Sequence, residues 1–347
     1  MYVLNLEGRM GTMLVRYLHA EGMSWGKLVG AAPRSGKDSL AVEPLKTGVS
    51  TTRELISLLD ANALEFEATL TLSASQLLSP ITSDSTLVCQ GLNYSEHAAE
   101  AQQHTRRSNL IFAKASSSLT GPYSPIVRPT DVELLDYEVE IGLVLRTELT
   151  ADAHVSNKNI GHYVAGVVLC NDVSARDTMF GASFLQWFHG KSYRTFCPAG
   201  PVLYYLSAEE TAATLNNLTI RLWLNGELRQ SASSSQLIYK PAETLTHLAQ
   251  YLDLKRGDVL LTGTPGGVTS PASPVLVDIL KTHLMADETR REKLRGEMVK
   301  TRPFMQPGDV VTATLTDELR ALSLGGQENT ISQQVPRQPT GAVRRAP

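Results

Sequence analysis

The sequence predicts a mixed α/β fold that is rich in β-strands, with a sandwich-like or barrel-like core and a smaller N-terminal domain. Short β-rich runs recur from about residue 86 onward, turn signals such as Asn225-Gly226 separate them, and only a few helices are evident. Hydrophobic residues make up 42% and charged residues 19% of the 347 residues, so the chain can bury a large core.

Residues 1–85 are predicted to form the small N-terminal domain. Alternation of apolar and polar residues at 13–17 and 27–31 predicts short strands there. Thr51 or Thr52 can cap a helix, which apolar residues at helical spacing predict directly after them. A segment rich in serine and threonine then connects this domain to the rest of the chain.

Residues 86–332 are predicted to form the main domain. Its expected strands are rich in β-branched and aromatic residues and lie at 86–92, 110–114, 137–145, 163–173, 201–206, 218–226, 258–265 and 309–317. Helices are expected after Tyr94, near 240–251 and inside the charged segment 277–300. The last helix belongs to a long connection, 269–305, where a solvated helix is favoured over a second lip above a site or an added dimer contact. The proline-rich tail, 333–347, is predicted to be disordered.

The bulk composition argues against several classes of partner. The net charge is −3, from 32 basic and 35 acidic residues, whereas nucleic-acid and membrane binders usually show a basic excess. No stretch is long and apolar enough to span a bilayer.

The odd number of cysteines, Cys89, Cys170 and Cys197, favours a reducing compartment, so we expect a cytoplasmic protein. Cys170 and Cys197 have apolar neighbours and are expected to be core residues.

The run DYEVEI at residues 136–141 is the first candidate for chemistry. Residues two apart in a strand share a face, so Asp136, Glu138 and Glu140 would lie together. Like charges on one face repel, and either water or a divalent cation must compensate for them. This motif alone favours a solvent-exposed acidic face over a metal site.

Asp172 follows the apolar run VAGVVLC and Asn171, at the expected carboxyl end of a buried strand. A third carboxylate aimed at Glu138 and Glu140 would complete a metal triad, but polar residues at strand ends often only begin a loop. Arg176 and Asp177 are open to two interpretations, a structural ion pair or a helix cap.

His97 and Glu100 lie in the segment GLNYSEHAAE, where Ser95 can cap a short helix. Residues at i and i+3 are neighbours on a helix surface, and a carboxylate beside an imidazole raises its basicity. The pair can therefore act as a general base, although an isolated pair of this kind is more often a surface contact.

Lys191 lies between glycine and serine in an aromatic-rich segment. Its ammonium could contact a substrate carbonyl or carboxylate, but an exposed loop lysine is the commoner case.

The glycines of LTGTPGG, at 261–267, let backbone N–H groups approach an anion closely. A tight turn is the alternative interpretation of that segment.

Taken in order, seven motifs resemble the fumarylacetoacetate hydrolase (FAH) family between about residue 86 and residue 331: GLNYSEHAAE, LIFAKASSSLTGP, DYEVEIG, CNDVSARD, QWFHGKSYRTFCPAGP, LTGTPGGV and QPGDVV. The resemblance implies a β-roll or β-sandwich catalytic core, a smaller N-terminal domain and a homodimer. It also implies one Mg²⁺ or Mn²⁺ ion per active site and a small-molecule oxo acid as substrate.

The resemblance also carries roles over to single residues. The metal ligands it implies are Glu138, Glu140 and Asp172. The catalytic residues it implies are a water-activating dyad on a lid-like helix and a lysine, namely His97, Glu100 and Lys191. Substrate contacts are expected from Tyr94, Lys114, Arg176, Gln186 and Thr264.

The expected reaction is metal-dependent hydrolysis of a carbon–carbon bond in a 2,4-dioxo acid, such as an acylpyruvate or fumarylpyruvate, with a metal-bound pyruvate enolate as the leaving group. The alternative on the same site is decarboxylation or tautomerisation of an oxaloacetate-like 2-oxo diacid. A third hypothesis is a binding protein without activity. Family members often carry other residues where Phe188, His189, Tyr193 and Arg194 stand, which is expected to alter the substrate pocket.

Overall fold

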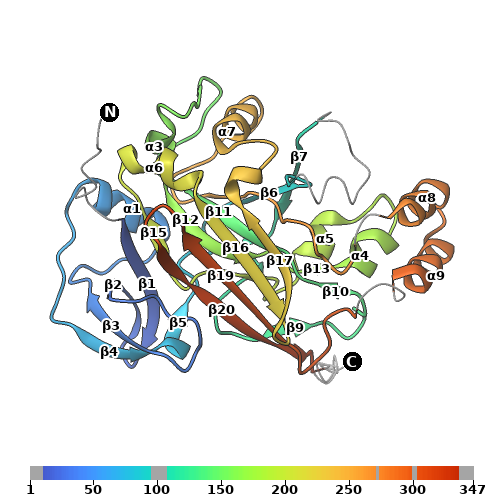
Figure 1. Cartoon of the computed structure of the whole chain (residues 1–347), viewed down its shortest axis with the longest axis horizontal. Helices are drawn as coiled ribbons and strands as arrows, with labels where there is room; N and C mark the ends of the chain where they lie inside the picture. Colours follow the sequence, from blue (N-terminus) through green and yellow to red (C-terminus); the bar gives the residue numbers. More distant parts are fainter. Residues whose placement is uncertain (1–10, 95–107, 271–272, 299–302, 336–347) are drawn as a thin grey trace, which may run out of the picture.

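The computed structural model describes residues 11–94, 108–270, 273–298 and 303–335 (Figure 1). Its largest element is a sheet with the strand order β4-β3-β2-β1-β15-β12-β11-β18-β6-β7, in which β5 pairs additionally with β1. The strands of this sheet are β1 (Thr12–His19), β2 (Gly22–Val29), β3 (Ser39–Pro44), β4 (Leu70–Ser73), β5 (Leu77–Leu78), β6 (Leu87–Gly91), β7 (Leu110–Lys114), β11 (Val139–Leu145), β12 (Val164–Asn171), β15 (Leu203–Tyr205) and β18 (Val259–Leu261). The strand-rich mixed α/β fold predicted from the sequence is confirmed.

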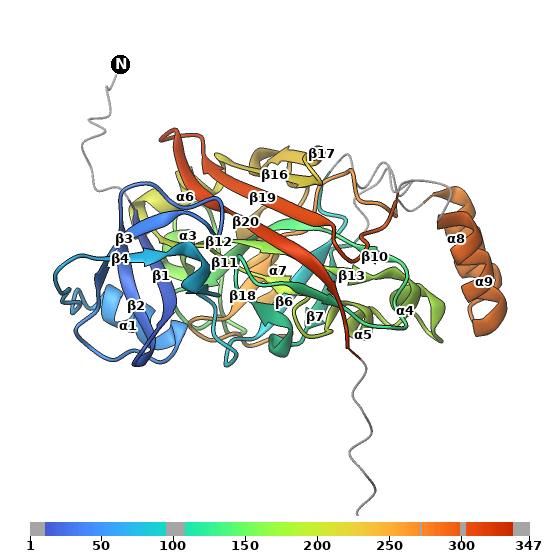
Figure 2. The same cartoon turned by 90° about the horizontal axis from the view of Figure 1, so that it is seen from below.

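A second sheet lies across the central strands of the first (Figure 2). Its order is β17-β16-β19-β20-β9, with β9 (Ile126–Arg128), β16 (Leu218–Leu224), β17 (Glu227–Ser233), β19 (Val310–Asp317) and β20 (Leu322–Gln333). The β16–β17 hairpin turns at Asn225 and Gly226, whose φ values of 51° and 82° suit the tight turn that this pair predicts. Two short pairs complete the strands: β10 (Leu135–Asp136) with β13 (Ser174–Ala175), and β8 (Leu119–Thr120) with β14 (Cys197–Pro198).

The core lies between the two sheets and on the far side of the larger one. Every residue of β11 and β12 is buried, which explains their nearly continuous apolar sequences. Ile141 belongs to the cluster that includes Ile220 of the second sheet, whereas Val144 belongs to a second cluster with Ile56. The central strands are thus covered on both faces, and polar side chains at their ends enter a buried environment.

The helices surround these sheets. They are α1 (Thr52–Asp60), α3 (Ile160–Tyr163), α4 (Arg176–Gly181), α5 (Trp187–Lys191), α6 (Ala208–Leu215), α7 (Pro241–Ala249), α8 (Pro274–Thr282) and α9 (Asp287–Met298), with single 3₁₀ turns at Ala74–Gln76, Ser116–Ser118 and Ser234–Gln236. Thr51 caps α1 by accepting from the Glu54 N–H, and the Glu54 carboxylate accepts from the Thr51 N–H in return. Within the described ranges, no helix has the length and apolar character needed to cross a membrane.

The N-terminal strands continue the large sheet. β1 pairs with β15, placing Leu14 opposite Leu203, so residues from the first part of the chain extend the central strands (Figure 1). The Ser- and Thr-rich connector contains a 3₁₀ turn and the short strand β5. The domain boundary after residue 85 stays a prediction.

The connection 269–305 differs from the single solvated helix that we expected. It contains α8 and α9, and Ser273 caps α8 by accepting from the Leu276 N–H. Leu276 and Leu294 of the two helices pack together in one buried cluster with Leu134. The helix expected after Tyr94 and the tail beyond residue 335 lie outside the described residues.

Gly166 permits the close approach of β12 and β15. A Cβ atom at this position would lie 2.2 Å from the carbonyl oxygen of Tyr204, which belongs to the backbone and cannot rotate away. Gly166→Ala is expected to lower the free energy of unfolding by about 2 kcal/mol or more through overpacking. Gly296→Ala is the control, because its Cβ would meet nothing within 4 Å and alanine favours the helical backbone at this exposed position of α9. Thermal unfolding of both variants checks this, and equal changes would contradict it.

Candidate active site

Three acidic side chains meet at the ends of the central strands. Val139 pairs with Asn171 in the β11–β12 ladder, so Glu138, just before β11, lies beside Asp172, just after β12. Glu140 is one position further along β11, opposite Cys170. Ligand atoms of Glu138, Glu140 and Asp172 all lie within 4.8 Å of one another, and all three residues are buried. The exposed acidic face favoured by the motif alone is therefore wrong.

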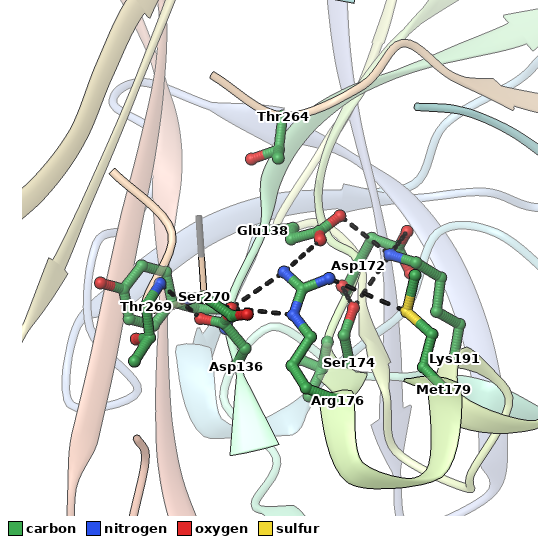
Figure 3. A network of polar contacts seen from close by, with 12 residues as sticks. Asp136, Glu138, Asp172, Ser174, Arg176, Met179, Lys191, Thr264, Thr269 and Ser270 are labelled. Carbon is green, nitrogen blue, oxygen red and sulfur yellow. Dashed lines mark hydrogen bonds and ion pairs between the residues drawn. The ribbon is translucent and has the colours of Figure 1, made fainter. Parts of the chain in front are cut away.

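The motif predicted that Asp136 shares one strand face with Glu138 and Glu140, and this prediction is wrong. It belongs to β10, which pairs with β13, and the regular strand β11 begins only at Val139. Its carboxylate accepts from the backbone N–H groups of Thr269 and Ser270, at 2.9 and 3.1 Å, and from Arg176 Nε at 2.9 Å. Asp136 therefore anchors a guanidinium beside the acidic cluster (Figure 3).

Arg176 connects Asp136 to Glu138. Its Nη2 lies 2.6 Å from Glu138 Oε1, and the whole side chain is buried (Figure 3). Neither interpretation of Arg176 and Asp177 from the sequence holds for the arginine, because its guanidinium forms salt bridges with Asp136 and Glu138. Asp177 instead accepts from the backbone N–H groups that precede Asp136, at Glu133 and Leu134.

Lys191 approaches the same cluster from α5. Its Nζ donates to Glu138 Oε2 at 2.9 Å, to Asp172 Oδ2 at 2.7 Å and to Ser174 Oγ at 2.9 Å (Figure 3). The residue is 1% exposed, so the exposed loop lysine considered above is ruled out. Burial by itself would lower the pKa of Lys191, but Asp172 and Glu138 outweigh burial and raise it, which keeps the ammonium protonated.

Lys114 completes the set of cations around the acidic residues. From the end of β7 its Nζ donates to Asp172 Oδ1 at 2.7 Å and to backbone carbonyls of Val173 and Lys191. Four buried carboxylates therefore face three cationic side chains, which leaves one negative charge in excess.

Among the described residues, Glu140 is the carboxylate of this group that forms no salt bridge with the three cationic side chains. Its Oε2 accepts the Gly263 N–H at 2.8 Å, whereas Oε1 has no hydrogen-bond partner among the described residues. Burial, and then the nearby charges of Asp172 and Glu138, raise the pKa of Glu140 well above its usual range. A buried oxygen without a partner next to two further carboxylates suits a divalent cation, which prefers oxygen ligands.

Thr264 and Tyr94 are both buried near these residues. Thr264 Oγ1 donates to the Val139 carbonyl at 3.0 Å and accepts from Gln230 Nε2 at 2.8 Å. The Tyr94 hydroxyl has no hydrogen-bond partner among the described residues, and burial, followed by the charge of Glu140, raises its pKa. Gln230, which comes from β17, was not predicted as a site residue because no local sequence pattern marks it.

Gln186 does not join this group. Its side chain is exposed, and Nε2 donates to the Ser183 carbonyl at 2.8 Å. His97 and Glu100 lie outside the described residues, so their role stays a prediction from the sequence.

A cavity of about 240 Å³ opens onto the cluster. Its polar side is formed by Gln90, Glu138, Arg176, Lys191, Thr264 and Ser270. Its apolar side is formed by Leu92, Leu110, Phe112, Phe180, Leu185 and Trp187, together with residues from α8. The buried Ser270 hydroxyl has no hydrogen-bond partner among the described residues and was not predicted as a site residue.

The residues that differ from common family members do not line this cavity. Phe188, His189 and Arg194 are exposed, and Tyr193 is half-buried against the ring of His189, 5.1 Å between centroids. The expected change of the substrate pocket therefore does not come from these four positions in the described structure. Helix α8 of the connection 269–305 instead supplies part of the cavity wall.

The fold and the buried acidic triad define a class of proteins, which comparison with known proteins identifies. The family model described as fumarylacetoacetate (FAA) hydrolase C-terminal matches residues 86–332. The chain belongs to this family, and members of the family are enzymes.

Similar proteins include tautomerases and isomerases. A mitochondrial oxaloacetate tautomerase of Rattus norvegicus is 38% identical over 191 residues, 55% of this chain and 59% of that protein. The match thus spans about three fifths of the relative's length. A mitochondrial oxaloacetate tautomerase of Xenopus laevis is 31% identical over 281 residues, covering 81% of this chain and 76% of that protein. The crystal structure of a probable 2-hydroxyhepta-2,4-diene-1,7-dioate isomerase from Mycobacterium abscessus superposes with a TM-score of 0.67 at 26% identity, covering 94% of this chain and all of the other.

Proposed function

We propose that this protein is a metal-dependent tautomerase or isomerase of a 2-oxo acid, which moves a proton at the carbon next to the oxo group. The observation that carries the proposal is the buried Glu138–Glu140–Asp172 triad, of which Glu138 lines the polar side of a cavity, with the ammonium of Lys191 directly beside it. Such a site can bind a small anionic oxo acid and stabilise the negative charge of its enolate.

Glu138, Glu140 and Asp172 would hold the metal ion. The unpartnered Glu140 Oε1 and the excess negative charge support this assignment, while Mg²⁺ and Mn²⁺ remain equally suited to oxygen ligands. When bound, the ion supplies Lewis acidity toward the oxygens of the oxo acid.

The protein's own residues would stabilise the charge that develops on the substrate. Lys191 uses its three hydrogens on Glu138, Asp172 and Ser174, so it contributes a fixed positive charge beside the reacting oxygens. Arg176 donates to Asp136 and to Glu138, so its guanidinium contributes a second fixed positive charge beside Glu138. Because both cationic side chains are already held in place, little movement of the protein is needed as the enolate forms.

Tautomerisation is favoured over the carbon–carbon hydrolysis that we first expected. Both relatives described above are named as oxaloacetate tautomerases, and the similar solved structure is named as an isomerase. Hydrolysis remains the second candidate, because the His97 and Glu100 motif that activates water in the resembling family is present in the sequence. In a tautomerase the same pair could take the proton from carbon.

Proton NMR in D₂O tests these alternatives directly. With Mg²⁺, the enzyme is expected to accelerate deuterium exchange at C3 of oxaloacetate or phenylpyruvate, and a chelator should remove the acceleration. Release of acetate and pyruvate from acetylpyruvate would instead establish the hydrolase, and loss of CO₂ from oxaloacetate the decarboxylase. Binding without any conversion would leave the binding-protein hypothesis.

The assembly and location of the protein stay proposals. We propose a homodimer, without nucleic-acid or membrane partners, which light scattering of the purified protein can check. Cys89, Cys170 and Cys197 are free and buried, which fits a reducing compartment such as the cytoplasm. The relatives above are named as mitochondrial proteins, so fractionation of cells should compare both compartments.

A further inference from the structure

We propose that the preferred substrate carries an apolar group, of aryl or branched-alkyl type, where oxaloacetate carries its second carboxylate, and that helix α8 selects this group. The inference rests on the proposed function for the reaction itself. It concerns the part of the cavity that faces away from the acidic triad, and it predicts another group there than the second carboxylate of the diacids in the relatives' names.

A continuous apolar surface leads away from Lys191. The Lys191 Nζ lies 5.1 Å from the centroid of the Phe112 ring, and that ring lies 5.2 Å from the ring of Trp187. The Trp187 ring in turn lies 6.2 Å from the ring of Phe180, at an interplanar angle of 86°. The three aromatic side chains line the cavity in this order, so a substrate with its oxo acid at Lys191 would direct its other end along them.

Helix α8 closes the apolar surface at the far end. Leu276, Val277 and Leu280 line the cavity, and Leu280 packs with Phe180 against the buried cluster that joins α8 to α9. These three residues occur at helical spacing, so they form one face of α8. The exposed residues of the same helix, such as Val275, lie outside the cavity.

The position of α8 is fixed by its partner helix. Arg290 of α9 is fully buried, and its Nε donates to the Phe180 carbonyl at 2.7 Å. Its Nη1 donates to the His283 carbonyl at 2.6 Å, in the turn between the two helices. The charged connection is therefore tied to α4, and α8 forms a structured wall of the cavity.

The charges along the cavity do not suit a second carboxylate. Arg176 and Lys191 are the cationic residues among the described lining residues, and each is already engaged by two carboxylates. A distal carboxylate placed among Phe180, Leu276 and Leu280 would lose its hydration without gaining a partner. An apolar group would instead gain from leaving water.

Backbone strain marks the same wall. Leu92 and Leu185 line the cavity with φ values of 52° and 57°, and Phe184 next to Leu185 has a φ of 59°. Branched and aromatic residues rarely adopt this left-handed region, and such strain concentrates at ligand-binding sites. The fold thus accepts an unfavourable backbone to direct apolar side chains into the cavity.

The volume suits a group of about the size of a phenyl ring. A dry apolar cavity of roughly 150 Å³ accommodates benzene. The present cavity of about 240 Å³ leaves the remainder for the oxo-acid end of the substrate. The class of substrate that fits is therefore a 2-oxo monocarboxylic acid such as phenylpyruvate.

The experiment compares phenylpyruvate with oxaloacetate in the metal-dependent exchange assay. In the wild-type protein, kcat/KM for phenylpyruvate should exceed that for oxaloacetate by about tenfold or more. Leu280→Lys places an ammonium at the apolar end and should lower this ratio by about tenfold, because it can pair with the second carboxylate. Val275→Lys adds the same charge to the exposed face of α8 and should leave the ratio unchanged. A wild-type preference for oxaloacetate, or equal ratios in both variants, would overturn the inference.

A binding measurement separates this inference from the proposed reaction. Phenyllactate and malate have the corresponding side groups but no oxo group to enolise, and calorimetry on the Mn²⁺-loaded protein can compare them. We expect phenyllactate to bind about tenfold tighter or more, with the preference reduced in Leu280→Lys. If no oxo acid shows exchange but this preference is found, the proposed reaction fails and the apolar site stands. If malate binds as tightly as phenyllactate, the apolar site is wrong whatever the reaction.

Discussion

Replacing Glu140 with glutamine is expected to abolish metal binding and turnover while leaving the protein folded. Glu138 and Asp172 are held by Arg176, Lys191 and Lys114, whereas the Glu140 carboxylate receives one hydrogen bond, from a backbone N–H. Its charge has no cationic partner among the contacts described, so a divalent cation gains most from it. Glutamine keeps the shape and removes that charge.

Thermal unfolding with and without Mn²⁺ measures this effect. At a metal concentration of 100 times Kd, binding should stabilise the wild-type protein by about 2.7 kcal/mol, and Glu140→Gln should show none of this. Without metal the variant should unfold at or above the wild-type temperature, since it removes a buried charge repelled by Asp172 and Glu138. Glu65→Gln, at an exposed salt bridge, is the control. Retention of Mn²⁺ with unchanged affinity by Glu140→Gln would show that the triad is not the metal site.

Replacing Lys191 with methionine should produce the second large effect, on both stability and rate. The change leaves Glu138, Asp172 and Ser174 without a donor that they share in a buried environment. Removing one partner of a buried ion pair costs about 3–5 kcal/mol, so the metal-free variant should lose this amount in its free energy of unfolding. Loss of the positive charge beside the enolate should lower kcat by about 10²–10³.

Urea unfolding in the presence of chelator, followed by exchange kinetics with Mg²⁺, checks both parts. Mn²⁺ should restore more stability to Lys191→Met than it adds to the wild-type protein, because it also replaces the missing cation. Lys281→Met, on the exposed side of α8, is the matched control and should change neither quantity. If Lys191→Met is as stable as the wild-type protein in chelator, the ion network around the triad does not contribute as described.

Several elements could be predicted because their signals are local. The strands at β6, β7, β11, β12, β16 and β19 follow runs of β-branched and aromatic residues, and Thr51 with Glu54 marks the start of α1 by direct side-chain contact. The long strand β20 was missed because two of its buried positions carry polar residues, Gln327 and Asn329, whose amides donate to backbone carbonyls of other segments. Hydrophobic periodicity cannot detect a strand that buries amides.

The sequence by itself determined the family and the three acidic residues, because the order of short motifs is preserved along the chain and needs no knowledge of distance. Only the tertiary structure decided that these carboxylates are buried together, since the Val139–Asn171 pairing joins strands that are separate in the sequence. The same is true of the apolar wall, which gathers side chains from β7, α4, α5 and α8. Hydrophobic burial and strand register act between distant segments, so the side of the cavity expected to select the substrate was not visible in any local pattern.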